Sequence, residues 1–164
     1  MRKKILTVLS MLLFLSSQAV AADQGAIELK SVAEVEVTIK NDKGEKEVKR
    51  VAAAKANVTP GDAVIFTTFY SNNGNEPASD IVINNPMPEH MLYIDGSAEG
   101  SGTKIELSVD KGRSFGAPEN LKMMDVKGRE RSAGPSDYTH IRWRLSEPLP
   151  PGGKGSVSFR AKVK

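Results

Sequence analysis

The sequence predicts an all-β fold, and three observations carry that prediction. Apolar and polar residues alternate with period two in most segments, as they do in half-buried strands. Turn signals built from Gly, Pro, Asn and Asp separate these segments at intervals of about 8–12 residues. Throughout the segments after residue 22, the longer windows lack an apolar stripe with helical spacing. We therefore expect an immunoglobulin-like β-sandwich of about seven to nine strands.

Strands in the first half are expected wherever this alternation is clear. The segment Val35–Ile39, for example, alternates Val and Ile with Glu and Thr, which places its apolar side chains on one face. Asn, Asp and Gly at 41–44 tolerate the backbone angles of a tight reversal. The segment 84–88, Asn-Asn-Pro-Met-Pro, is expected to stop a strand at Ile83, because proline cannot donate a hydrogen bond to a ladder. The strands expected in this half are 35–39, 47–51, 63–70, 81–83 and 91–94.

In the second half, the same alternation defines two clear strands at the end of the chain. In the first of them, Ile141, Trp143 and Leu145 share one face and two arginines share the other. The segment 116–137 is the least regular, and it is interpreted as a loop, a lid or a partner-binding segment with a short strand around Leu121 and Met123. The strands expected in this half are 104–110, 114–115, 141–145 and 156–163.

The N-terminal segment 1–21 has the order of a secretory signal peptide. Residues 2–4 are basic, an apolar run follows over 5–15, and small residues end the segment at Ala21. The apolar run is too short to stay in a bilayer as a spanning helix. We therefore expect cleavage after Ala21 and export to the periplasm or the extracellular space. The mature chain, 22–164, is expected to form a single domain with no integral membrane segment.

Charge and cysteine content narrow the partners of the mature chain. Three of the 23 basic residues lie within 1–21, so 20 remain against the 20 acidic residues. A chain with balanced charge has no general attraction to nucleic acids or anionic membranes, so no nucleic-acid partner is expected. The chain has no cysteine, which excludes disulfides and thiolate metal sites. The fold must therefore be stabilised by an ordinary apolar core.

Several turns occur in an order that resembles a known family. They are the Pro-Gly-Asp turn at 60–62, the Asn-Asn-Gly turn at 72–74, the Pro-Met-Pro segment at 86–88 and Tyr93–Ala98. This order resembles the bacterial conserved repeat domain, catalogued as domain of unknown function eleven, which occurs in surface and secreted proteins. The resemblance covers 58–98 best. It implies an immunoglobulin-like fold and an exported location, and it supplies no activity and no functional residues.

The hairpin that follows the strand 104–110 resembles an Asp-box. Ser108, Asp110, Gly112 and Phe115 match its pattern of Ser-x-Asp-x-Gly-x-Ser/Thr-aromatic, which occurs in sialidase-like propellers and other exported proteins. In such a turn the Asp carboxylate accepts bonds from backbone amides, the Gly permits a positive φ, and the aromatic ring lies beneath the hairpin. We interpret these four residues as a structural hairpin, with sugar binding as the alternative.

No motif in the sequence predicts catalysis, a metal site or a cofactor. His90 and His140 are the only histidines, and they lack the paired spacing of a zinc motif. The chain has no Gly-x-Ser-x-Gly elbow, and its Gly-rich segment at 100–104 lacks the spacing of a phosphate-binding loop. We interpret both histidines as ordinary surface or loop residues.

The prediction is therefore a non-enzymatic exported module that binds another envelope protein or a glycan, or that associates with itself. Contacts would come from polar loop ends or from strand addition along a free edge. The candidate ligand-binding residues are Asn72, Asn73, Asn75, Asn85, Glu89, Asp95 and Ser97.

Two alternatives stay open. A carbohydrate-binding module needs exposed aromatic rings for stacking against sugars. Its candidate rings are Tyr70, Tyr93, Tyr138 and Trp143. A hydrolase needs carboxylates from distant loops to converge in one pocket.

Overall fold

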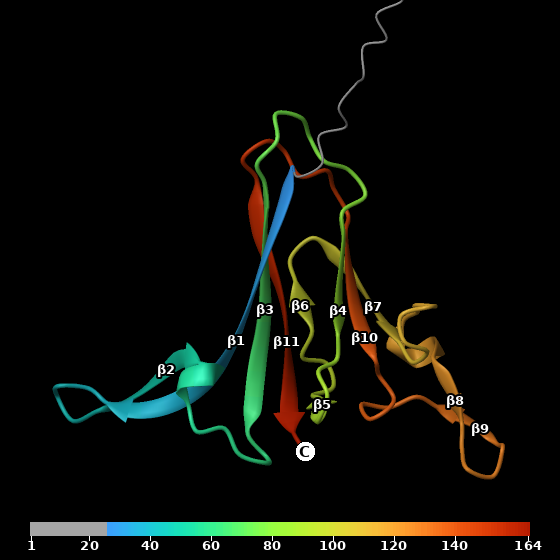
Figure 1. Ribbon diagram of the computed structural model, residues 1–164, viewed down its shortest axis with the longest axis horizontal. Coiled ribbons are helices and arrows are strands. Elements are labelled where there is room, and N and C mark those ends of the chain that lie inside the picture. Colours follow the sequence, from blue (N-terminus) through green and yellow to red (C-terminus); the bar gives the residue numbers. More distant parts are fainter. Residues whose placement is uncertain (1–25) are drawn as a thin grey trace, which may run out of the picture.

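The computed structural model describes residues 26–164, which form an all-β fold (Figure 1). Two antiparallel sheets face each other in a sandwich-like arrangement. The larger sheet has the strand order β2 (Lys46–Ala52), β1 (Ile27–Lys40), β3 (Ala63–Asn72), β11 (Lys154–Val163) and β5 (Met91–Tyr93), and β6 (Glu99–Gly100) also pairs with β11. The smaller sheet has the order β4 (Val82–Pro86), β10 (His140–Leu145) and β7 (Thr103–Ser108).

A separate hairpin lies beside the two sheets. It consists of β8 (Lys122–Met124) and β9 (Glu130–Ser132), and it occupies part of the segment that the sequence pattern left irregular. Two 3-10 helices, η1 (Ala53–Lys55) and η2 (Pro118–Asn120), complete the described elements. Within residues 26–164, no helix is long and apolar enough to cross a bilayer. The signal-peptide prediction for 1–21 lies outside the described residues.

Eleven strands occur within residues 26–164, and the expectation of seven to nine was too low. The difference comes from very short strands such as β6 and β9, because a period-two pattern needs about four residues to be recognised. The short strand expected around Leu121 and Met123 is present as β8. The strand expected at 114–115 is absent, and only an isolated bridge between Leu107 and Gly116 occurs next to it. The other expected strands are present with shifted ends. The largest shift is in β1, which begins at Ile27 and not at Val35.

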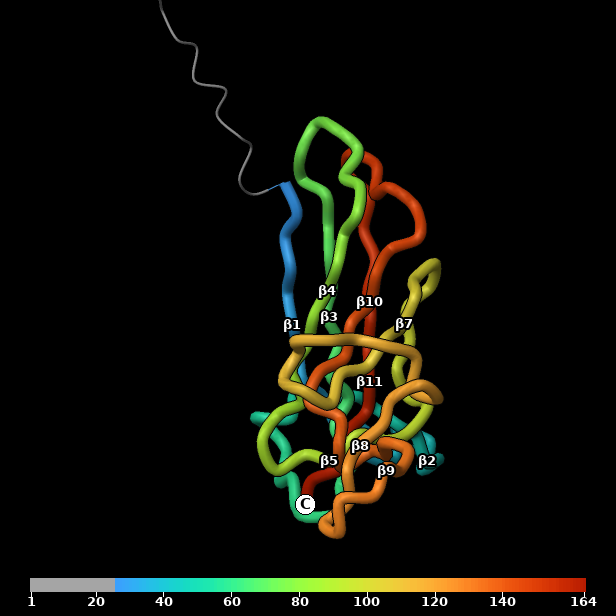
Figure 2. Tube along the Cα trace, turned by 90° about the vertical axis from the view of Figure 1, so that its right-hand side faces the viewer, coloured from blue at the N-terminus to red at the C-terminus, as the bar shows by residue number. Residues whose placement is uncertain are grey.

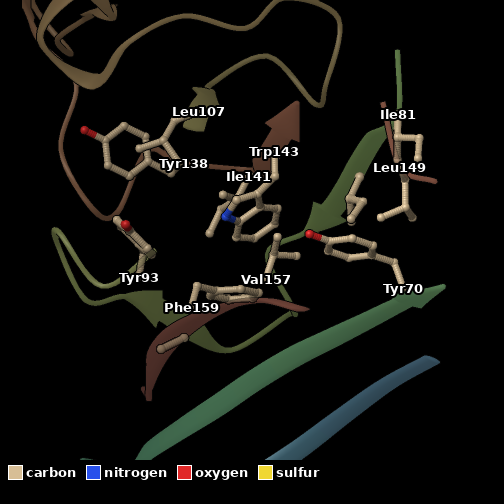
Figure 3. Close-up of a cluster of buried hydrophobic side chains, with 12 residues drawn as sticks. Tyr70, Ile81, Tyr93, Leu107, Tyr138, Ile141, Trp143, Leu149, Val157 and Phe159 are labelled. Atoms are coloured by element: carbon tan, nitrogen blue, oxygen red, sulfur yellow. The ribbon is translucent and has the colours of Figure 1, made fainter. Parts of the chain in front are cut away.

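The core lies between the two sheets (Figure 3). Trp143 of β10 is fully buried, and its ring centroid lies 6.2 Å from that of Phe159 on β11. Its Nε1 is the one buried side-chain donor within the described residues that has no partner. The core residues are Tyr70, Ile81, Ile83, Tyr93, Leu107, Tyr138, Ile141, Trp143, Leu149, Val157, Phe159 and Ala161.

Candidate functional site

The larger sheet extends past the smaller sheet on the side of β1 and β2. Asn85 of β4 lies over β3, because its Nδ2 donates to Thr68 Oγ1 at 3.0 Å. β1 pairs with the far side of β3, so it lies beyond the edge of the smaller sheet, as Figure 2 shows. Leu29 of β1 pairs directly with the core residue Tyr70 and so points to the same face. Leu29 is nevertheless 53% exposed, which shows that this part of the face is uncovered.

An apolar groove of about 290 Å³ lies where the sandwich is uncovered. We call it the open-side groove, and its lining residues are Ser31, Val32, Ala33, Phe66, Thr67, Thr68, Asn85, Pro86 and Phe159. Three of its polar side chains are linked, since Ser31 Oγ and Thr68 Oγ1 lie 3.0 Å apart and Thr68 Oγ1 also accepts a hydrogen bond from Asn85 Nδ2. The rest of the lining is mainly apolar.

β4 has a free edge beside this groove. The C=O of Ile81 accepts a bond from β10, and the N–H of Met87 donates to the residue that precedes β10, with N to O distances of 3.0 and 2.8 Å. Backbone groups alternate in direction along an antiparallel strand, so those of Val82 and Asn84 point away from β10. In the part of the chain that the structure describes, no second strand pairs with β4 on this side.

Pro86 belongs to the outward row of β4, and the strand therefore continues three residues past Ile83, where the segment 84–88 was expected to stop it. The nitrogen of Pro86 would face away from β10 even if it carried a hydrogen, so the proline removes no ladder bond. Asn85 therefore lies in a strand and not in a loop. Its side chain bonds across to the larger sheet at the groove.

Asn72 holds two loops together. It is completely buried, and its Nδ2 donates to the C=O of Glu76 at 2.8 Å and to that of Leu149 at 2.9 Å. Its Oδ1 accepts from the N–H of Gly74 at 2.9 Å. The polar atoms of this side chain are thus engaged within the fold, which makes Asn72 a corner residue with no open face toward a ligand.

The other candidate residues do not form one site. Asn73 and Asn75 are exposed at the end of the molecule where β3 ends, and Asn73 Nδ2 donates to Glu28 Oε2 at 2.8 Å. Glu89 and Asp95 are exposed on either side of β5, toward the opposite end (Figure 1).

Ser97 is tied to the larger sheet. Its Oγ donates to the C=O of Arg160 at 3.1 Å and accepts from the N–H of the same residue at 3.0 Å. This pair of bonds attaches the segment between β5 and β6 to β11. The side chain of Ser97 is therefore engaged in holding that segment.

The turn that resembles an Asp-box is held by one carboxylate and one buried hydroxyl. Ser114 Oγ donates to Asp110 Oδ2 at 2.6 Å, and the N–H groups of Arg113 and Ser114 donate to Oδ1 at 3.0 and 2.9 Å. These bonds, with that of the Ser114 hydroxyl foremost, hold the pKa of Asp110 well below its ordinary value. Ser108 Oγ donates to Asp110 Oδ1 and accepts from the N–H of Gly112, which has φ +79°.

Phe115 packs against an ion pair on the outer face of the smaller sheet. The guanidinium carbon of Arg142 lies 4.0 Å from the centroid of the Phe115 ring. Arg142 also donates to Glu106 Oε2 from Nε at 3.0 Å and from Nη2 at 2.7 Å. Hydrogen bonds from Lys104 and Arg142 lower the pKa of Glu106. This arrangement commits Arg142 to the fold.

The aromatic rings proposed for sugar stacking are buried. Tyr70, Tyr93 and Tyr138 are at most 7% exposed, and Trp143 is fully buried. Phe69, which is 47% exposed, is the aromatic ring among the exposed large apolar side chains. Within residues 26–164, no three His, Cys, Asp or Glu side chains cluster closely enough to hold a metal ion. The open-side groove with the β4 edge is therefore the best-formed candidate site.

Comparison of the chain with family models gives no match, and neither do comparisons with curated proteins and with solved structures. The resemblance of 58–98 to the conserved repeat domain stays a prediction. The site is thus defined by its geometry alone. Sequence reasoning missed Ser31, Ala33 and Phe66 as lining residues. Ser31 and Ala33 continue the odd-numbered row of β1 back from Val35, and Phe66 lies on β3 opposite Ala33.

Proposed function

We propose that this chain is an exported, non-enzymatic, immunoglobulin-like module that takes up an extended polypeptide segment as an additional strand next to β4. The observation that carries the proposal is the free edge of β4 directly beside the open-side groove. The partner is a segment of another envelope or extracellular protein. Support for export comes from the pattern of 1–21, and support for the immunoglobulin-like class comes from the two packed antiparallel sheets.

An added strand would pair the free edge of β4 and would also cover the open-side groove. The outward N–H and C=O groups of Val82 and Asn84 would gain partners, which provides affinity that is independent of the partner's sequence. The strand would lie over β1 as a fourth strand of the smaller sheet, so alternate side chains would enter the groove beside Ala33 and Phe66. We therefore expect a partner segment with small or apolar residues at alternate positions.

Selection from a library of displayed peptides tests the proposal. Selected peptides should have this alternating pattern, and hydrogen exchange should show that they protect the amides of Val82 and Asn84. Sedimentation of the protein alone shows whether the β4 edge of a second copy is itself a sufficient partner. Peptides that protect another surface would contradict the proposal.

A pair of matched proline variants separates edge binding from general destabilisation. Asn84→Pro removes an outward N–H without removing a bond to β10, and should weaken peptide binding at least about tenfold. Val48→Pro is the control on the other free edge. The backbone bond from Asn41 to Glu45 sets an alternation in which Val48 also faces outward. Equal effects of the two variants on binding would rule out the β4 edge.

A further inference from the structure

The larger sheet has a free edge of its own at β2, in the arm that projects from one side of the molecule (Figure 1). β2 pairs with β1 over seven residues in an unbroken register, from Lys46 opposite Lys40 to Ala52 opposite Glu34. The strand contains no proline, so neither a missing donor nor a bulge prevents a further strand from pairing there. In the part of the chain that the structure describes, no strand occupies this position.

The backbone groups of Lys46, Val48 and Arg50 point away from β1. The N–H of Asn41 donates to the C=O of Glu45 at 2.9 Å, and this bond sets the alternation of the hairpin. Because the register is continuous, every second residue of β2 from Lys46 onward has its N–H and C=O on the outer side. These groups form a row of donors and acceptors that an added strand can pair.

The side chains at the centre of β2 alternate between two faces. Glu47 and Lys49 share one face, where both are exposed and Lys49 Nζ lies 3.6 Å from Glu47 Oε2. Val48 lies on the other face and is 62% exposed, although it is a large apolar residue in the middle of a strand. The edge therefore has an apolar residue at its centre, with an anion before it and a cation after it.

This pattern is complementary to itself when a second β2 runs antiparallel to the first. With a two-fold axis at Val48, each Glu47 lies opposite Lys49 of the second copy. These are non-hydrogen-bonded positions, because the outward backbone groups belong to the residues on either side, and side chains approach most closely at such positions. Each carboxylate would then lie between two ammonium groups, one from each copy. On the other face, Val48 would contact Val48 of the second copy.

Other arrangements of two β2 strands bring like charges together. With the axis at Lys46 or at Arg50, that cation would lie opposite itself. Parallel strands in register would place the Glu47 side chains of the two copies beside each other. With the axis at Val48, Lys46 meets Arg50 of the second copy, but Glu36 Oε1 lies 3.4 Å from Arg50 Nε and partly compensates its charge. The charge pattern thus selects one direction and one register.

We propose that two copies of this chain associate through β2 as an antiparallel pair with Val48 on the two-fold axis. The two larger sheets would then form one continuous sheet. A contact through one strand edge is small, and small contacts give weak association, so we expect a monomer–dimer equilibrium that depends on protein concentration. The proposal is independent of strand uptake at β4, because β2 and β4 belong to different sheets.

Charge reversal tests the register. Glu47→Lys and Lys49→Glu each place like charges opposite one another in the dimer, so each should raise the dissociation constant from sedimentation equilibrium at least about fivefold. An equimolar mixture of the two variants should associate again, because every pair between positions 47 and 49 then joins opposite charges. A change in folding or in net charge alone does not produce this recovery. A wild type that stays monomeric up to millimolar concentration, or a mixture that does not recover, would overturn the proposal.

Proline variants of the two free edges separate this dimer from one formed through β4. Val48→Pro removes an outward N–H and should abolish the dimer, whereas Asn84→Pro should leave the dissociation constant unchanged. Thermal unfolding shows whether each variant keeps the fold, and the mixture of charge variants decides the question if Val48→Pro does not. A dimer that survives in Val48→Pro, or one that is lost in Asn84→Pro alone, would refute association through β2.

Discussion

The two sides of the sandwich are closed in different ways. On one side, which we call the closed side, β10 and β7 cover β11, β5 and β6, and Trp143 is fully buried among apolar neighbours. On the other side, the larger sheet continues into β1 and β2 while the smaller sheet ends at β4. There the layers are joined by the polar bridge from Ser31 through Thr68 to Asn85, beside the open-side groove.

Because of this difference, one side of the sandwich stabilises the fold and the other side can bind an added strand. A densely packed core cannot accept another side chain, because every change of volume is felt by its neighbours. A groove beside an unpaired strand can accept one without displacing the core. The same pair of sheets can therefore be densely packed on one side and able to accept a partner's side chains on the other. Matched substitutions on the two sides test whether their packing differs.

The largest effect is expected from Trp143→Ala. The side chain is fully buried, so its removal should lower the free energy of unfolding by about 3–5 kcal/mol. Phe66→Ala is the counterpart at the groove, where the ring is half-buried and stacks on Phe159 with centroids 5.0 Å apart. We expect roughly half the loss there, since solvent already contacts the ring. Urea unfolding measures both, and equal losses would show that the two sides do not differ in packing.

Enlarging a small side chain should destabilise the closed side more than the open side. A Cβ at Gly100 would lie 2.6 Å from Thr103 Oγ1 and 2.9 Å from Trp143 Cδ1, so Gly100→Ala should cost about 1–3 kcal/mol. Ala33 lines the groove, where Ala33→Val has space for its added methyl groups. We expect that change to stay within about 0.5 kcal/mol of the wild type in urea unfolding. A larger cost of Ala33→Val than of Gly100→Ala would contradict the assignment of an open side.

The closed side could be predicted well from the sequence, and the open side could not. In β10 and β11, every second residue faces the core and must be apolar to exclude water, so apolar and polar residues alternate regularly around Trp143 and Phe159. In β1 the row that faces the core continues through Leu29, Ser31 and Ala33. The small and polar members of that row broke the apolar pattern, so the strand was recognised only from Val35 onward. Those residues line or border the groove, where an apolar row is not required.

The candidate site could not be predicted because it depends on how the sheets overlap. The groove exists because the larger sheet has more strands than the smaller one, and no local pattern contains that information. Asn85 was selected for its polarity as a loop residue, but its amide bonds to Thr68 in the opposite sheet.

A smaller effect is expected from Asn85→Ala, which removes the polar bridge between the layers. The loss of its bond to Thr68 should lower the free energy of unfolding by about 0.5–1.5 kcal/mol. Asn75→Ala is the matched control, because Asn75 is exposed at the far end of the molecule and should change stability by less than about 0.5 kcal/mol. If the two variants unfold at the same urea concentration, the bridge does not hold the open side together.

The ion pair between Asp137 and Arg131 lies outside both sheets, and its contribution to stability depends on pH. Asp137 accepts two bonds from Arg131, at 2.6 and 2.7 Å, and this pairing lowers the pKa of its carboxyl from 3.8 to about 2. Because the folded state binds this proton more weakly than the unfolded state does, the stabilisation is present above pH 4 and is lost as the pH falls toward 2. In urea unfolding, the gap between wild type and Asp137→Asn should therefore shrink over this range. The difference in the free energy of unfolding between wild type and Asn85→Ala involves no titrating group, so it should stay constant over this pH range. If both differences decrease in parallel, the stability of the open side depends on charged groups.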